Sequence, residues 1–445
     1  MIRPPDSPGT DQATTGAATA AEARTQQFEG APAAATDVSG AAQPVFVEGL
    51  NYIGETPDGP LMELNMGPQH PSTHGVLRLV LRVEGEVVRY ADPDIGYLHT
   101  GFEKDFERVT YHQGTPWTDR MDYLSPPGNN LGYALAVEKL LGETVPVRAQ
   151  RIRVIMVELA RIGSHLIWVG THALDLGAQS TFLYAWRDRE RVLEINELVS
   201  GVRMMTSFIR IGGLMADTPP GFEEAVRAFL RDFRARCDDY ELLLTANPLW
   251  EDRTKGLGLI TGEEALAWGF SGASLRGSGV SYDVRKDAPY SGYEDYDFDV
   301  PLGVNGDVYD RYLVRIHEMR QSLRIIEQAL DRLEPGPITI TNRKVVLPPR
   351  HELDTSMEAV IHHFKLITEG FRPPAGEVYQ AVESPRGELG FYVVSDASNK
   401  PYRIKVRAPS FQMVSAIPKL VVGHLVADVV AILGSLDFIL GDVDR

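Results

Sequence analysis

The stretch RAQRIRVIMVELARIGSHLIWVGTHALD, residues 148–175, is the clearest structural signal in this chain of 445 residues. Its apolar residues recur every three or four positions and share one stripe of a helix, namely Ile152, Ile155, Met156, Leu159, Ile162 and Leu166. The same spacing predicts helices over residues 184–211, 223–245 and 308–333, and a shorter helix over 133–141. Four helices of twenty-odd residues predict a long bundle as the central core.

Strands are expected on both sides of this bundle. Residues 76–83 alternate apolar and charged side chains, which is typical of a half-buried strand, and residues 61–66 precede them as a second strand. Further strands are predicted after Glu84 and over 338–347 and 377–406, followed by a helix near 418–433. The expected fold class is therefore α+β, with a long central helical bundle, a small N-terminal α/β sheet region and a mixed C-terminal region.

The composition suggests four regions along the chain. They are a disordered tail rich in Ala, Thr and Gly over 1–44, a β-rich region over 45–120, the bundle over 121–335 with a Gly- and Tyr-rich insertion at 256–306, and a mixed region over 336–445. An insertion of that length is too long for a simple connector, so we expect it to be functional or packed against something.

The charge and the cysteine count exclude several classes of protein. Lys and Arg number 44 against 61 Asp and Glu, which gives a net charge of −17 and disfavours nucleic acid as a partner. A single cysteine, Cys237, cannot form an internal disulfide or hold a Cys-rich metal site or Fe–S cluster. The most apolar stretch, 417–440, is interrupted by charged residues, and no signal peptide is apparent, so neither a membrane span nor secretion is expected.

Residues 67–75 form a loop between two predicted strands and carry His70 and His74. Histidines four apart are typical of a metal site when they lie on a helix, but these lie on a loop with no further ligand nearby. Two other interpretations remain open. The imidazoles bond to the backbone of the turn, or they contact a ligand, where a neutral histidine can donate a hydrogen bond and supply a proton near neutral pH.

Four further places in the sequence bear groups of chemical interest. Tyr123 lies in an acidic, Arg-containing heptapeptide, which is either a salt-bridged helix start or a place where a hydroxyl donates to a carbonyl. Asp175 ends an apolar helix, where an acid is poorly placed against the helix dipole. Arg386 follows a turn and can present its guanidinium to a carboxylate or cofactor, and Glu158 is expected to pair with Arg161 inside the bundle.

Six motifs in order resemble one known family over about residues 52–445. They are MGPQHPSTHG at 66–75, IGYLHTGFEK at 95–104, RMDYL at 120–124, LRGSGV at 275–280, PRG at 385–387 and GDVDR at 441–445. Together they resemble the D subunits of the proton-pumping NADH–quinone oxidoreductase, the respiratory complex I. That resemblance implies a fold similar to the large subunit of nickel–iron hydrogenases. The stretches similar to the metal-binding segments of hydrogenases are 120–125 and 437–442, and neither contains cysteine, so no metal is expected on this chain.

The resemblance also implies roles for individual residues. His74 and Tyr123 match the family's residues that hydrogen-bond the quinone headgroup, and Asp175 matches the acid paired with that histidine. His70 matches the first histidine of the family's loop and is expected to belong to the same headgroup site, as a residue that supports the contacting side chains. Two positions depart from the family pattern, with Thr100 where an arginine is frequent and Met205 where a histidine is frequent. In the family, both positions lie close to an Fe–S cluster that a neighbouring subunit holds. Met205 cannot titrate, so proton-coupled tuning of that cluster through this position is in doubt.

The function implied by the resemblance is that of a subunit of an enzyme, the H⁺-translocating NADH:quinone reductase. The chain is expected to take electrons from an Fe–S cluster in a neighbouring subunit and to help bind, reduce and protonate ubiquinone or menaquinone. Expected partners are other complex I subunits, especially that Fe–S subunit and the membrane subunit at the quinone entrance, on the cytoplasmic face of a bacterial plasma membrane. The alternatives are a non-catalytic scaffold in the same assembly and a metal-dependent, hydrogenase-like enzyme.

Overall fold

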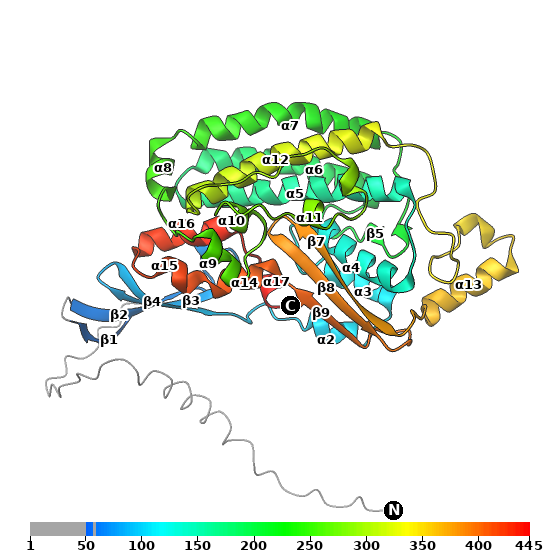
Figure 1. Cartoon of the computed structure of the whole chain (residues 1–445), viewed down its shortest axis with the longest axis horizontal. Coiled ribbons are helices and arrows are strands. Elements are labelled where there is room, and N and C mark those ends of the chain that lie inside the picture. Colours follow the sequence, from blue (N-terminus) through cyan, green and yellow to red (C-terminus); the bar gives the residue numbers. More distant parts are fainter. Residues whose placement is uncertain (1–49, 57–58) are drawn as a thin grey trace, which may run out of the picture. The chain divides into compact units, whose positions relative to one another are not determined.

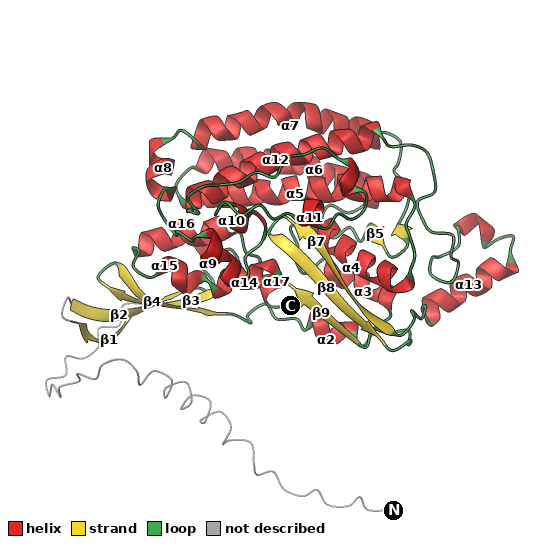
Figure 2. Cartoon of the chain, viewed as in Figure 1, coloured by secondary structure: helices red, strands yellow, loops and turns green. Residues whose placement is uncertain are grey.

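The structure is a computed structural model, and it describes residues 50–56 and 59–445. The tail expected over residues 1–44 lies outside the described residues. The described residues belong to one compact unit. They combine a helical bundle with small antiparallel sheets, as Figure 2 shows in red and yellow, so the expectation of an α+β fold is confirmed.

Four long helices form the central bundle. They are α5 (Val147–Asp175), α6 (Gln179–Ser200), α7 (Phe222–Leu244) and α12 (Val308–Asp331). Helix α5 packs against α6 and α12, and α7 covers those two on the outer side (Figure 1). The bundle predicted from apolar spacing is therefore present, and its longest helix has nearly the predicted bounds.

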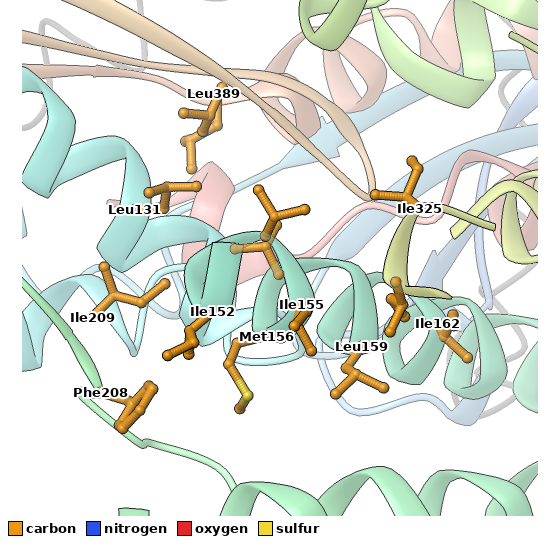
Figure 3. Packing of buried hydrophobic residues seen from close by; sticks show 14 of the residues in the cluster. Leu131, Ile152, Ile155, Met156, Leu159, Ile162, Phe208, Ile209, Ile325 and Leu389 are labelled. Carbon is orange, nitrogen blue, oxygen red and sulfur yellow. The ribbon is translucent and has the colours of Figure 1, made fainter. Parts of the chain in front are cut away.

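The apolar stripe of α5 is the centre of the larger core. Ile152, Ile155 and Leu159 are fully buried, and Figure 3 shows them between Leu131 on one side and Ile325 of α12 on the other. At roughly 25 cal/mol per Å² of apolar surface, burying one such side chain contributes about 1.5–3 kcal/mol. A second apolar cluster lies under the N-terminal sheet and includes Leu79 and Ile432.

Two antiparallel sheets lie beside the bundle. The N-terminal sheet has the order β1 (Leu50–Thr56), β2 (Gly59–Met66), β3 (Arg78–Glu84) and β4 (Val87–Asp94). All its neighbours are antiparallel, so the expected α/β character of this region is wrong. The C-terminal sheet consists of β7 (Gly376–Ser384), β8 (Gly387–Ser395) and β9 (Arg403–Arg407), and it packs on α4 (Pro126–Leu141).

Shorter elements connect these layers. Two-residue strands β5 (Ile209–Arg210) and β6 (Gly213–Leu214) pair with each other. The remaining helices are α2 (Phe102–Phe106), α3 (Tyr111–Thr118), α8 (Pro248–Thr254), α9 (Gly262–Ala267), α10 (Gly272–Arg276), α11 (Val284–Asp287), α13 (Met357–Thr368), α14 (Pro409–Ser415), α15 (Ile417–Val421), α16 (Val426–Leu436) and α17 (Leu440–Val443). No helix among the described residues is long and apolar enough to cross a membrane.

Three predicted elements differ from the structure. The helix expected over 184–211 ends at Ser200, because Gly201 adopts a left-handed conformation with φ of 77° and caps it. The helix expected over 418–433 is two helices, and the break at Gly423 hydrogen-bonds to Val88 of β4. Residues 338–347 form no strand apart from one bridge between Thr339 and Gly213.

Candidate functional site

The histidine loop leaves β2 through Gly67. Its φ is 92°, and a Cβ atom there would lie 2.0 Å from the carbonyl oxygen of Leu77, so only glycine fits. A single 3₁₀ turn over Pro71–Thr73 follows, and His70 caps it by accepting a hydrogen bond from the Ser72 amide at 3.2 Å. The loop is therefore a compact turn that ends at His74.

His74 and Asp175 are brought together across 101 positions of sequence. His74 Nε2 lies 3.1 Å from Asp175 Oδ2, and both side chains are mostly buried. Ser72 Oγ donates a hydrogen bond to the other carboxylate oxygen at 3.3 Å. Asp175 is the last residue of α5, where the charge of its carboxylate opposes the helix dipole.

His70 does not join this pair. It is exposed, and its ring bonds to the backbone of its own turn, which is the first of the two interpretations left open for this loop. Within residues 50–56 and 59–445, no three His, Cys, Asp or Glu side chains lie close enough to hold a metal ion.

Tyr123 lies in the connection between α3 and α4 and is part-buried. Its hydroxyl makes no hydrogen bond with any other described residue, including His74 and Asp175. Burial raises the pKa of Tyr123, although Arg386 opposes that effect, so the hydroxyl stays protonated at neutral pH. The side chain lines a cavity of about 20 Å³ together with Gly163 of α5 and Val192 of α6, which is no larger than one or two water molecules need.

Arg386 links the connection between α3 and α4, which contains Tyr123, to residues that lie beside His74. Its guanidinium is fully buried and pairs with Asp122 at 2.8 Å and with Asp437 at 3.1 Å. Asp437 precedes Phe438, whose ring packs edge-on against His74 with 6.4 Å between ring centroids. The sequence-based expectation that Arg386 presents its guanidinium to a carboxylate is thus confirmed.

The stretches 120–125 and 437–442 lie directly against each other. A Cβ atom on Gly441 would be 2.4 Å from the Met121 carbonyl oxygen, so a side chain at this position would separate them. Asp442 is buried at the same place, and burial, followed by the nearby Asp122, raises the pKa of its carboxyl to about 6. A buried carboxyl that titrates close to neutral pH therefore lies beside Asp122 and Arg386.

A larger charged network fills the space between α5, α12 and the 256–306 insertion. Arg276 pairs with Glu383 at 2.8 Å and also with Glu318, which lies 2.9 Å from His165. All its members are at most 1% exposed: the guanidinium groups of Arg161, Arg276 and Arg285, the carboxyls of Glu158, Asp283, Glu318 and Glu383, and the imidazole of His165. Three cations face four carboxyls, so the network is neutral only when it also holds one proton.

The pKa directions indicate where this proton resides. Burial, followed by the neighbouring Asp283, raises the pKa of Glu383 to about 7. Burial lowers the pKa of His165, although the hydrogen bond with Glu318 acts in the opposite direction. Glu383 is therefore the carboxyl of this network whose protonation is most favoured by its surroundings.

The sequence predicted one pair of this network and missed the others. Arg161 Nε lies 3.1 Å from Glu158, as expected for residues three apart on one helix. Tyr293 of the insertion donates a hydrogen bond to Glu158 at 2.6 Å, which confirms that the insertion is packed against something. Most of the partners that sequence analysis missed are 42 to 153 positions apart, so no local pattern marks them, whereas Arg285 and Asp283 are only two positions apart.

Comparison with known proteins identifies relatives for most of the chain. Residues 175–445 match the family model described as "Respiratory-chain NADH dehydrogenase, 49 Kd subunit". The chain is 60% identical to a NADH-quinone oxidoreductase D subunit of Chloroflexus aurantiacus, the one numbered 2, over 86% of this chain and 94% of that protein. It is 56% identical to the NADH-quinone oxidoreductase D subunit of Citrifermentans bemidjiense, over 86% of this chain and 99% of that protein.

Proposed function

The chain belongs to the 49 kDa subunit family of respiratory-chain NADH dehydrogenase, whose curated relatives are named as D subunits of NADH-quinone oxidoreductase, and we propose that it forms the quinone-reducing site of that enzyme. The observation that carries this proposal is the pair His74–Asp175 together with a part-buried, protonated Tyr123 hydroxyl that makes no hydrogen bond with any described residue. A quinone has two carbonyl oxygens on opposite sides of its ring, and it needs one hydrogen-bond donor for each.

Reduction of a quinone to a quinol takes two electrons and two protons. In the proposed reaction, the electrons come from an Fe–S cluster in another subunit of the enzyme. His74 donates to one carbonyl oxygen, and Asp175 stabilises the charged imidazole before the proton leaves. Tyr123 donates to the other oxygen, and the phenolate that would remain is next to the guanidinium of Arg386.

Loss of these protons changes the charge of a closed site. Asp175 is then left without a cationic partner, and Arg386 links Asp122 and Asp437 close by. We infer that this charge change is the step that couples quinone reduction to distant proton translocation. The chain itself is proposed to act as a peripheral subunit on the cytoplasmic face of the plasma membrane.

The volume of the cavity beside Tyr123 indicates that the site must open before a quinone headgroup binds. The cavity lined by Tyr123 holds about 20 Å³, which is too small for a quinone ring. Binding therefore requires movement of the connection around Tyr123 or of the histidine loop. Because both side chains keep some exposed surface, a neighbouring subunit supplies the remaining wall in this proposal.

The relation to the nickel–iron hydrogenase large subunit is supported by the contact between 120–125 and 437–442, the two stretches that match its metal-binding segments. Asp437 and Asp442 lie in the second stretch and Asp122 in the first, and all three face Arg386. The guanidinium of Arg386 is thus held by carboxylates from both stretches, and neither stretch carries a thiolate.

Replacement of Tyr123 by phenylalanine tests the proposal. The ring volume stays the same, so we expect the complex to assemble and to pass electrons from NADH to an artificial acceptor at the normal rate. Quinone reduction should fall by roughly 10²-fold, the usual contribution of a positioned proton donor. Tyr402→Phe, at an exposed tyrosine, is the matched control and should leave both activities unchanged.

A scaffold role predicts a different result. Under that alternative, Tyr123→Phe has no effect on quinone reduction in an assembled complex, because no hydroxyl is needed. Equal activity of the Tyr123→Phe and Tyr402→Phe complexes would therefore contradict the proposed site.

A further inference from the structure

A large cavity lies on the described part of the chain at a place that no step above uses. Its volume is about 680 Å³, and its walls come from α3, the β5–β6 segment, residues 338–350 and the end of α13. Most of the lining is apolar, including Ile211, Leu214 and Val346. It is thus large enough for several side chains of a bound segment.

The charged side chains that line this cavity are all basic. Arg210, Arg343 and Arg350 line it, whereas no Asp or Glu does, in a chain whose net charge is −17. Arg343 pairs with Glu352 at 2.9 Å, but the Arg350 side chain has no hydrogen-bond or ion-pair partner among the described residues. The cavity is therefore complementary to a group that is apolar and negatively charged.

The apolar surface continues from the cavity onto α13. Ile367 lines the cavity and belongs to an exposed stripe of α13 that also contains Met357, Val360, Ile361 and Phe364. Phe364 is 65% exposed, which is unusual for a phenylalanine on a helix. Figure 1 shows α13 away from the four-helix bundle, at the opposite end of the described chain from the N-terminal sheet.

We propose that this cavity and the exposed face of α13 together bind an apolar, acidic segment of another protein subunit. A small ligand would fill the cavity but leave the stripe on α13 uncovered, whereas a protein segment covers both. A lipid surface is disfavoured, because interfacial helices carry a basic polar face, and α13 has one lysine against Glu358 with Glu369 at its end. The proposal depends on membership of a subunit family and does not depend on the quinone site.

The chain is suited to a cysteine-based test. Its only cysteine, Cys237, is buried, and burial raises the pKa of its thiol to about 12, so it does not react with maleimides. Ile361→Cys, at a position 50% exposed, should react readily in the isolated chain and about tenfold more slowly in the assembled enzyme. Leu242→Cys, on α7 and 82% exposed, is the control for apolar exposure away from the cavity.

A photoactivated cross-linker attached to the new thiol of the Ile361→Cys variant should then join one peptide of one other subunit, and this peptide should contain apolar residues with Asp or Glu. The linker on Leu242→Cys should not join that peptide. The proposal is wrong if the thiol at position 361 reacts equally fast in the assembled enzyme, or if the linker joins lipid or a basic segment.

Charge reversal tests the electrostatic part separately. Arg350→Glu should weaken binding of the cross-linked subunit about fivefold, as expected for loss of one ion pair, and Arg350→Lys should retain most of the affinity. A change of the cross-linked acid to lysine should restore binding to Arg350→Glu. Equal affinities of the glutamate and lysine variants would overturn the assignment of an acidic partner. The Tyr123→Phe complex should bind this partner normally, so failure here is distinguishable from failure of the quinone site.

Discussion

His74 holds a backbone conformation that is rare for residues other than glycine. Its φ of 49° and ψ of 42° are left-handed, which costs on the order of 1 kcal/mol. The hydroxyl of Thr73 bonds to the His70 carbonyl at 2.8 Å, and Ser72 bonds to Asp175, so neighbouring side chains hold the turn in place. This conformation directs the imidazole to the end of α5, and the pair is therefore formed before any ligand arrives.

A double-mutant cycle tests whether the pair acts as one unit. His74→Gln and Asp175→Asn should each lower the rate of quinone reduction, since each removes the same contact. The double variant should then lose little more than the worse single variant, with an interaction energy of about 1–3 kcal/mol. The measurement is quinone reduction by the assembled enzyme, with electron transfer to an artificial acceptor as the control. Additive losses would show that the two side chains act separately.

At the scale of the elements, two substitutions in the charged network between α5, α12 and β7 should differ in their effect on the stability of the fold. Glu318→Gln should destabilise the chain by about 3–5 kcal/mol, because it removes a buried, ionised carboxylate that contacts both Arg276 and His165. Glu383→Gln should cost much less, because the raised pKa of Glu383 means that its carboxyl is already partly protonated at neutral pH. Thermal unfolding of the two variants at pH 7 measures the difference, and equal losses would contradict the placement of the proton on Glu383.

The elements that the sequence predicted well are those with a local signal. The stripe of α5 and the alternation of β3 both depend on spacing within one segment, and the structure has them almost as predicted. The errors at α6 and at α15–α16 have a different origin. Gly201 ends a helix whose apolar spacing continues past it, and the break at Gly423 depends on a hydrogen bond to a distant strand.

The candidate site likewise contains residues that a local signal marked and contacts that no local signal marked. Residue type and local sequence indicated that His74, Tyr123 and Asp175 were chemically notable, but only the family resemblance suggested that they work together. The contact between His74 and Asp175 is now visible, whereas the role of Tyr123 in binding a quinone stays a prediction. Arg276 and Glu383 are separated by 107 positions, and nothing in either neighbourhood points to the other.

At the scale of the whole molecule, one buried histidine should shape the dependence of stability on pH. His172 is packed between Trp168 and Trp250, and burial, followed by His74, lowers its pKa to about 3. In the unfolded chain its pKa is near 6.5, so below that pH the unfolded state binds a proton that the folded state excludes. His172 therefore makes its full contribution to the free energy of unfolding above pH 6.5. As the pH decreases below 6.5, this contribution falls by up to about 1.4 kcal/mol per pH unit.

The His172→Gln variant should therefore be less stable at pH 7.5 and should lose less stability than the unmodified chain between pH 6.5 and pH 5. Thermal unfolding midpoints across this range provide the measurement. His351→Gln, at an exposed histidine, should keep the full slope. An unchanged slope in His172→Gln would mean that other groups account for the acid sensitivity.

The three guanidinium groups and four carboxyls buried between the bundle, the 256–306 insertion and β7 also constrain how this sequence can diverge. A lineage that loses Arg285 leaves Glu158 with only Arg161 and Asp283 with only Arg276 as cationic partners, and such a chain is less stable. Replacement of one charged residue of this network is tolerated only when a residue of the opposite charge is also replaced soon afterwards in the same lineage. Related sequences should therefore record paired substitutions at positions such as 158 and 285, which lie 127 residues apart and yet change together.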